Sequence, residues 1–207
     1  QWGDSGKPPA LLLHGTGFCA DVWDELAGNL VSDYRVIALD RRGHGESHKP
    51  AADHYHFIDY AEDICRVIGA LDLHGIYGIG HSAGATDLLL AAKLLPQRLT
   101  RLFAMEPTVM DPRVARDAEL SEGGRYSVEG VLRRQAEFDS FDAAFARFRA
   151  APAFANWTEI SLRTFIRRGF MSVENGRVRL RCTPEVESAV LRPIIEAMEQ
   201  KIGRAHV

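Results

Sequence analysis

The five residues at 80–84, Gly-His-Ser-Ala-Gly, constrain the fold of this chain more than any other stretch. An apolar run at 76–79 precedes them, and a run with helical periodicity at 85–95 follows them. A serine flanked by glycines between a strand and a helix is typical of the sharp turn that presents a nucleophilic hydroxyl. Both flanks favour glycine because a side chain there would meet backbone atoms. Free N–H groups and the helix dipole would favour negative charge beside Ser82.

Short apolar runs alternate with amphipathic segments over the first half of the chain. The apolar runs predict strands at 10–13, 34–39, 76–79 and 102–105. The amphipathic segments predict helices at 21–30, 57–71 and 85–95. Strands that are apolar throughout are typically buried on both faces of a parallel sheet. The pattern therefore predicts an α/β fold with a doubly wound, mostly parallel sheet, and a functional site at the carboxyl ends of its strands.

The loop at 14–18, His-Gly-Thr-Gly-Phe, follows the first predicted strand and carries a second signal. Its glycines allow the backbone N–H of Thr16 to point toward the space above Ser82. The N–H of Ala83 would be the other donor of an oxyanion hole, which stabilises the charge that develops during acyl transfer.

The loop at 40–47, Asp-Arg-Arg-Gly-His-Gly-Glu-Ser, follows the next predicted strand. Asp40 and Arg41 are types of residue found in catalytic sites, but we favour a structural role for them in holding a tight turn. His14 and His81 are interpreted in the same way, as groups that fix loops rather than as bases.

Together with Trp23, these motifs resemble the α/β-hydrolase fold superfamily over about Gly3 to Pro107. The resemblance implies an esterase-like member with a lid. It also implies a serine nucleophile, an Asp or Glu that orients a histidine, and that histidine as the base, in this chain order. The turn at 80–84 corresponds to the family's nucleophile elbow, here called the elbow. Members with aspartate or cysteine at the nucleophile position match less well because Ser82 stands there.

The resemblance divides the chain into an α/β-hydrolase core at 1–107, a helical cap at 108–193 and an end at 194–207. An aromatic stripe in the cap either packs it onto the core, which we favour, or lines an apolar acyl pocket. The stripe consists of Phe138, Phe141, Phe145 and Phe148. The pair Asn175-Gly176, between two apolar runs, predicts a short hairpin in the cap.

The end of the chain departs from the family pattern. We find neither of the family's last two strands after Pro193, and we expect a truncated chain from which the catalytic histidine is absent. The residues at 202–207 match the translation of a common sequencing adapter, so we expect a non-native tail and exclude His206 as the base. Glu106, after the strand at 102–105, is a candidate acid. The alternative, which we favour, is that Glu106 only ends the strand and opens the loop to the cap.

Two classes of function fit these observations. The first is a hydrolase that acts on a carboxylic ester or related acyl substrate through a serine nucleophile and an acyl-enzyme. The second is a non-catalytic protein of the same fold that binds a small ligand. The truncated chain by itself would be a catalytically inert fragment if the base is missing.

Composition and net charge limit the classes of partner that we expect. The 207 residues are 46% apolar and 26% charged, as in ordinary globular proteins, and the net charge of −3 argues against a nucleic-acid or membrane partner. Cys19, Cys65 and Cys182 lack the spacing of a metal site or a disulfide framework and fit a reducing compartment. We therefore expect a cytoplasmic protein with a small-molecule substrate, no metal and no cofactor, and leave its oligomeric state open.

Overall fold

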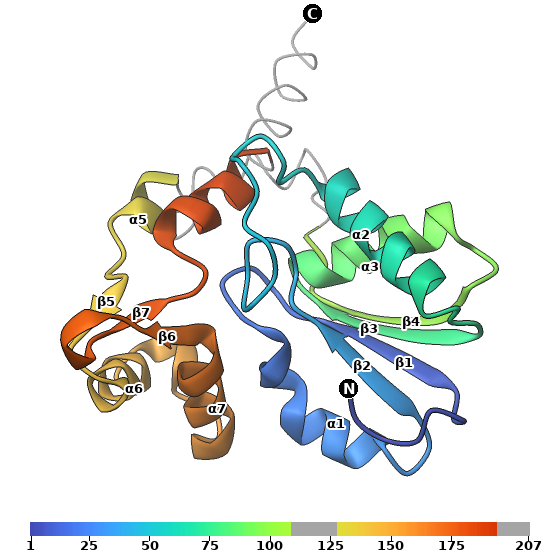
Figure 1. The fold of residues 1–207 in the computed structure, drawn as a ribbon, viewed down its shortest axis with the longest axis horizontal. Helices are drawn as coiled ribbons and strands as arrows, with labels where there is room; N and C mark the ends of the chain where they lie inside the picture. The colour runs from blue at the N-terminus through green and yellow to red at the C-terminus, as the bar shows by residue number, and fades with distance from the viewer. Residues whose placement is uncertain (109–127, 194–207) are drawn as a thin grey trace, which may run out of the picture.

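The core is built on a parallel sheet. The computed structural model describes residues 1–108 and 128–193, and in these ranges four parallel strands lie in the order β2-β1-β3-β4 (Figure 1). The strands are β1 (Pro9–Leu13), β2 (Arg35–Leu39), β3 (Ile76–His81) and β4 (Leu99–Met105). The predicted α/β fold with a parallel sheet is confirmed.

Helices cover both faces of this sheet. One face carries the 3-10 helix η1 (Ala20–Trp23) and α1 (Asp24–Leu30), and the other carries α2 (Phe57–Ala70) and α3 (Ala83–Leu94) (Figure 1). The helix predicted at 21–30 is thus divided into η1 and α1.

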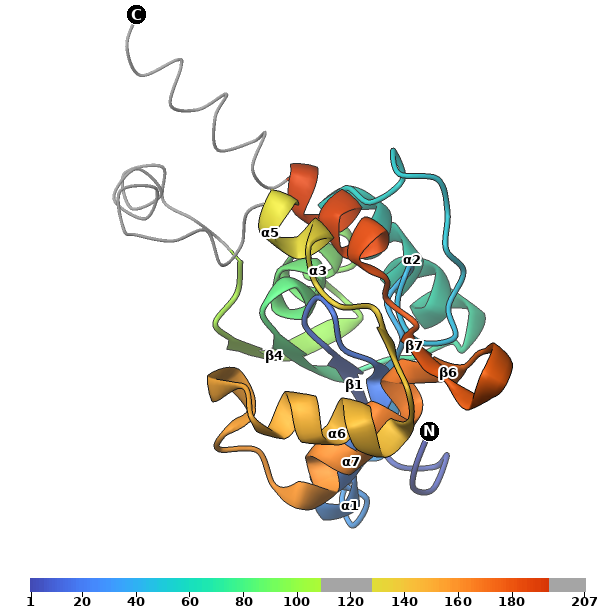
Figure 2. The ribbon, with the colours of Figure 1, turned by 90° about the vertical axis from the view of Figure 1, so that its left-hand side faces the viewer.

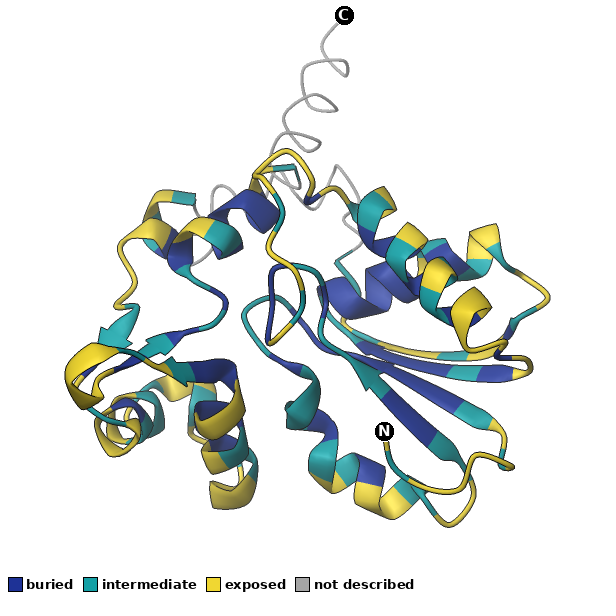
Figure 3. Cartoon of the chain, viewed as in Figure 1, coloured by how far each residue is buried: buried dark blue, intermediate teal, exposed yellow. Residues whose placement is uncertain are grey.

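The alternation of side chains along β1 explains this layering, since successive residues of a strand face opposite sides. Leu11 and Leu13 pack into the cluster with Ile68 of α2, whereas Leu12 packs into the cluster with Ala27 of α1. Figure 3 shows the buried centre of the sheet between helices whose outer faces are exposed. A strand buried on both faces needs apolar residues at every position, which the sequence of β1 provides.

The remaining described residues form a second layer beside the carboxyl ends of the strands (Figures 1 and 2). Its helices are α5 (Val128–Leu132), α6 (Phe141–Arg149) and α7 (Glu159–Gly169), with a further helical stretch at 184–193. Its strands β5 (Glu137–Phe138), β6 (Phe170–Ser172) and β7 (Val178–Leu180) pair antiparallel in the order β5-β7-β6. The short 3-10 helices are η2 (Pro152–Phe154) and η3 (Glu174–Gly176).

The hairpin predicted around Asn175-Gly176 is confirmed as β6 and β7. Both turn residues have positive φ angles, 60° and 73°, which asparagine and glycine tolerate best. The division of the chain at 107 and 193 stays a prediction. The residues at 109–127 and 194–207, which include His206 and the predicted tail, lie outside the described residues. Within the described ranges, no helix combines the length and apolarity needed to cross a bilayer.

The predicted aromatic stripe is only partly continuous. Phe138 lies in β5 rather than in a helix, because α6 begins at Phe141, which is itself 36% exposed. Phe145 and Phe148 pack against the buried cluster of this layer. Phe18 of the core joins the same cluster, with its ring centroid 5.4 Å from that of Trp157. The loop after β1 therefore packs into this second layer, at 128–193, which is called the cap below.

A buried ion pair connects the loop after β2 to α3. The Nε of Arg41 donates to a carboxylate oxygen of Asp87 at 2.6 Å, and the guanidinium lies 4.1 Å from the centre of the Tyr60 ring. Burial raises the pKa of Asp87 to about 6, although the Arg41 charge opposes this shift. Asp40 accepts hydrogen bonds from the N–H groups of Ala20 and Glu46. The structural roles expected for Asp40 and Arg41 agree with these contacts.

Two neutral histidines lie under the same loops. His14 is 1% exposed and its Nε2 accepts from the N–H of Arg41 at 3.1 Å, so its Nδ1 carries the proton and donates to the carbonyl of Gly15. The ring of His44, also buried, lies 5.1 Å from that of His14. Burial, with the Arg41 charge second, lowers the pKa of His14 to about 4. Burial likewise lowers the pKa of His44 well below its usual value.

We predict that the two glycines Gly84 and Gly69 respond oppositely to alanine. A Cβ on Gly84 would lie 2.5 Å from the carbonyl oxygen of His14, and such overpacking typically costs about 1–3 kcal/mol. A Cβ on Gly69, in α2, would meet nothing within 4 Å, and better helix propensity should add about 0.5–1 kcal/mol. Urea denaturation of the product of the complete gene measures both. Equal effects of Gly84→Ala and Gly69→Ala would contradict the close approach at the elbow.

We also predict that the fold loses stability in acid through His14. Because its folded pKa, about 4, lies below the unfolded value of 6.5, the unfolded state takes up the proton first. The free energy of unfolding should therefore fall by about 3 kcal/mol as the pH drops from 6.5 to 4. Urea denaturation across this range should show a flatter dependence for His14→Gln. The control His48→Gln, at an exposed side chain of the loop after β2, should keep the wild-type slope. An unchanged slope in His14→Gln would refute the assignment.

Candidate active site

Ser82 stands at the junction of β3 and α3 in a strained backbone conformation. Its φ is 54° and its ψ is −123°, a combination that residues with a side chain adopt rarely. Its N–H donates to the carbonyl of Met105 at 2.9 Å, and its own carbonyl accepts from the N–H groups of Ala85 and Thr86. Hydrogen bonds from β4 and from α3 thus hold the strained residue on both sides.

The loop after β1 lies directly against this turn, and the contacts there leave little room for a side chain. A Cβ on Gly15 would lie 3.2 Å from the Cβ of Ser82 and 3.0 Å from Nδ1 of His81. A Cβ on Gly80 would lie 2.6 Å from the Cα of Ala85. The expectation that the elbow needs glycine on its flanks is therefore correct, and the reason is backbone crowding.

The two predicted oxyanion donors lie on the two segments that meet here. Neither the N–H of Thr16 nor that of Ala83 donates a hydrogen bond within residues 1–108 and 128–193. Ala83 is the first residue of α3, where N–H groups lack intrahelical acceptors. The Thr16 hydroxyl lies 3.5 Å from Nη1 of Arg41, so the loop is tied to the buried Arg41–Asp87 pair.

The hydroxyl of Ser82 has one polar contact among the described residues, the Thr108 hydroxyl at 3.4 Å. No described histidine hydrogen-bonds to it. His14 and His44 are buried in the scaffold, and the ring of His81 packs beside Gly15. The remaining described histidines, His48, His54, His56 and His74, are exposed. Sequence analysis missed Thr108, because a hydroxyl after a strand end carries no distinctive signal.

Glu106 directly follows Met105, whose carbonyl binds the elbow. Its φ of 44° makes it a second non-glycine residue with left-handed backbone at the carboxyl edge of the sheet. The side chain is exposed and forms no hydrogen bond or ion pair with another described residue. The structure therefore brings Glu106 to the same edge as Ser82 without a described histidine beside it.

A cavity of about 600 Å³ lies between the cap and the loop after β1. Thr16 and Gly17 line it from the core. Five phenylalanines contribute its apolar wall: Phe18, Phe138, Phe148, Phe154 and Phe165. Members of the aromatic cluster therefore pack the cap and also face the cavity, so the two interpretations of the stripe are not exclusive. A cavity of this size and apolarity suits a small organic ligand.

Charged groups also border the cavity. Glu187, from the helical stretch at 184–193, is 7% exposed, and its carboxylate lies 2.5 Å from Nη1 of Arg134. Burial raises the pKa of Glu187, and the Arg134 charge opposes the shift. The sequence carries no signal that assigns a partner to Arg134. Its partner lies 53 residues further along the chain, so only the fold reveals the pair.

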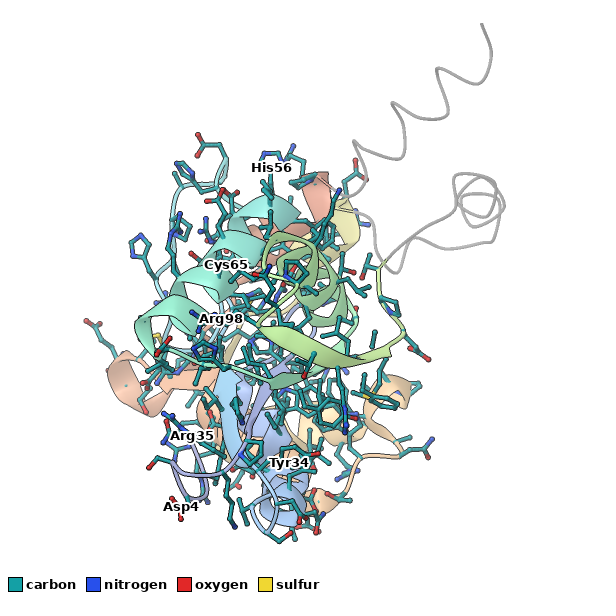
Figure 4. All side chains as sticks on the ribbon, turned by 90° about the vertical axis from the view of Figure 1, so that its right-hand side faces the viewer. Asp4, Tyr34, Arg35, His56, Cys65 and Arg98 are labelled. Atoms are coloured by element: carbon teal, nitrogen blue, oxygen red, sulfur yellow. The ribbon has the colours of Figure 1, made fainter. Side chains whose placement is uncertain are left out.

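The cysteines are free thiols. Burial raises the pKa of Cys19 and that of Cys182 to about 12, so both stay protonated and unreactive at neutral pH. Cys65 is half-buried on α2 (Figure 4). In the described part of the chain, no three His, Cys, Asp or Glu side chains gather in a way that could hold a metal ion.

Comparison with known proteins finds one matching family model and several related sequences. The family model described as alpha/beta hydrolase fold matches residues 8–181. A non-heme chloroperoxidase of Streptomyces lividans is 34% identical over 152 residues, which are 72% of this chain and 51% of that protein. A serine hydrolase-like protein of Danio rerio is 33% identical over 106 residues, 51% of this chain and 32% of that protein. The chain thus spans about half the length of the first relative and about a third of the second.

Solved structures share the fold. The thioesterase domain from the curacin biosynthetic pathway has a TM-score of 0.71 at 25% identity, over 94% of this chain and 71% of that chain. E-2-(acetamidomethylene)succinate hydrolase has a TM-score of 0.73 at 23% identity, over 93% of this chain and 67% of that chain. The family match covers most of the chain and includes the whole sheet and the strained serine turn. The chain therefore belongs to the α/β-hydrolase fold family.

Proposed function

We propose that this protein is a hydrolase that acts on a carboxylic ester or a related acyl compound, with Ser82 as the nucleophile. The observation that carries the proposal is the strained conformation of Ser82 at the start of α3, held from both sides by hydrogen bonds. Strain of this kind costs about 1–3 kcal/mol and persists where the surroundings impose it, typically at functional sites. Similarity to a thioesterase domain supports thioesters as part of the substrate class.

In the proposed reaction, the Ser82 oxygen attacks the acyl carbon while a base accepts the hydroxyl proton. The N–H groups of Thr16 and Ala83 hold the negative oxygen of the tetrahedral intermediate. The intermediate then expels the alcohol or thiol, which takes the proton from the base, and leaves an acyl-Ser82 ester. Water attacks this ester by the same route and regenerates the serine.

The base and its acid partner complete the proposal. Family resemblance implies a histidine base, and no described histidine bonds to Ser82, so we place the base outside residues 1–108 and 128–193. Glu106 is the candidate for the acid, because it follows the residue that binds the elbow and has a left-handed backbone. Exposure of its side chain equally suits a residue that only ends β4.

The second candidate is a non-catalytic protein that binds a small apolar molecule in the cavity. The observation that favours it is the cavity of about 600 Å³, which needs no base to bind a ligand. Hydrolysis of short-chain para-nitrophenyl esters by the product of the complete gene separates the candidates. Turnover that depends on Ser82 supports the hydrolase, and ligand binding without turnover supports the alternative.

We predict that a fluorophosphonate probe labels Ser82 in the product of the complete gene. An activated serine reacts with the phosphorus centre, whereas ordinary serines do not. Mass spectrometry after digestion identifies the labelled peptide. Ser82→Ala should abolish labelling and reduce turnover to the residual level of a disabled triad, about 10³–10⁴-fold over water. Ser172→Ala, at an exposed serine of β6, is the control and should label normally. Labelling that survives Ser82→Ala would exclude this nucleophile.

We further predict that the substitutions of Thr16 by proline and by alanine differ in their effect on kcat. Thr16→Ala keeps the N–H and should change kcat little. Thr16→Pro removes the donor and should lower kcat by about 10²–10³-fold. Circular dichroism and thermal melting establish that both variants are folded before their rates are compared. Equal rates in two folded variants would remove Thr16 from the oxyanion hole.

A further inference from the structure

The charges around the cavity between the cap and the core are unbalanced. Its described lining includes three arginines, Arg133, Arg134 and Arg147, and a single acid, Glu187. Because Glu187 pairs with Arg134 at 2.5 Å, Arg134 contributes no free charge. Arg133 and Arg147 are exposed and form no ion pair with another described residue. Two positive charges at the border of this cavity are therefore uncompensated within the described residues.

The two arginines come from different elements of the cap. Arg147 lies in α6, and Arg133 lies just after α5. Figure 2 shows these two helices. Apart from the Arg134–Glu187 pair, Thr16 and Gln135, the rest of the wall is mostly apolar, and the five phenylalanines are its largest members. An apolar cavity bordered by guanidinium groups is complementary to a molecule with an apolar body and an anionic group. Arginine is well suited to this task because its planar donors match a carboxylate.

The side of the cavity that faces the core lies near the elbow. Thr16 lines the cavity, and the neighbouring Gly15 lies against Ser82, where its Cβ would be 3.2 Å from that of the serine. Ser82 itself does not line the cavity, so the acyl group of a ligand would extend past Thr16 to reach the elbow while the rest of the ligand stays among the phenylalanines and the arginines.

We propose that the substrate is an acyl compound with an apolar chain that carries a second, anionic group, such as the monoester of a dicarboxylic acid. Arg133 and Arg147 bind the anionic group, and the phenylalanines contact the chain. This inference rests on the proposed function for the reaction, but the preference for an anionic ligand is a property of the cavity and can be measured without turnover.

The experiment compares two ligands of equal chain length, monomethyl suberate and dimethyl suberate, which differ in one negative charge. Calorimetry with the Ser82→Ala variant of the complete gene product measures their affinities without hydrolysis. We expect the monoacid to bind about tenfold more tightly, since two solvent-accessible ion pairs together supply about that factor. Arg133→Gln with Arg147→Gln should remove the preference.

The matched control carries the same change in net charge. Arg167→Gln with Arg192→Gln alters two exposed arginines that do not line the cavity, and it should keep the full preference. Equal affinity for the two ligands, or loss of the preference in both double variants, would overturn the inference.

Turnover provides the second readout. With Ser82 present, the ratio of kcat/KM for mono-para-nitrophenyl suberate over para-nitrophenyl octanoate should fall about tenfold in the Arg133→Gln, Arg147→Gln variant. Mono-para-nitrophenyl esters of succinate and adipate then show which chain length fits. If neither ester is turned over while the binding preference persists, the proposed hydrolase function fails and the inference about the cavity holds.

Discussion

The close approach of two backbone segments at the elbow is the contact on which the rest of this structure depends. A Cβ on Gly84 would lie 2.5 Å from the carbonyl oxygen of His14, and a Cβ on Gly15 would lie 3.2 Å from the Cβ of Ser82. The same loop places Thr16 at the border of the cavity and Phe18 in the aromatic cluster of the cap. Glycine at these positions costs conformational entropy on folding, but it allows the close approach that the proposed oxyanion hole requires.

A buried cluster of polar side chains maintains the close approach of these segments. The buried pair Arg41–Asp87 joins the loop after β2 to the elbow helix, and neutral His14 accepts from the backbone of Arg41. A buried ion pair adds little net stability, but removal of one partner leaves an uncompensated charge. This polar cluster therefore fixes the relative position of two loops and α3 rather than increasing the overall stability. Asp40 and Arg41 are residue types found in catalytic sites, but here Asp40 accepts hydrogen bonds from loop N–H groups and Arg41 pairs with Asp87 of α3.

The aromatic cluster of the cap both packs this layer and faces the cavity. Phe165 and Phe148 are in edge-to-face contact at 5.7 Å, and both also line the cavity beside Thr16. An aromatic cluster can do both because its inner rings satisfy the packing of the cap while its outer edges stay open to a ligand. The selectivity that we propose for the charged border has a low structural cost, because solvated arginines need no partner until an anion binds. In the proposed function, the core supplies the reacting groups and the cap selects the substrate.

The sequence by itself determined the core. Continuous apolar runs specify buried parallel strands, and Gly-x-Ser-x-Gly between a strand and a helix specifies the elbow, because both signals are local and arise from sterics and burial. The pair Asn175-Gly176 specified its hairpin for the same reason. Only the tertiary structure decided which distant residues meet. Thr108 beside Ser82, Glu187 beside Arg134 and Phe18 within the cap are each separated by many residues from their partners. Periodicity reports which face of an element is buried but not what lies against it, so these contacts become visible only when the chain is folded.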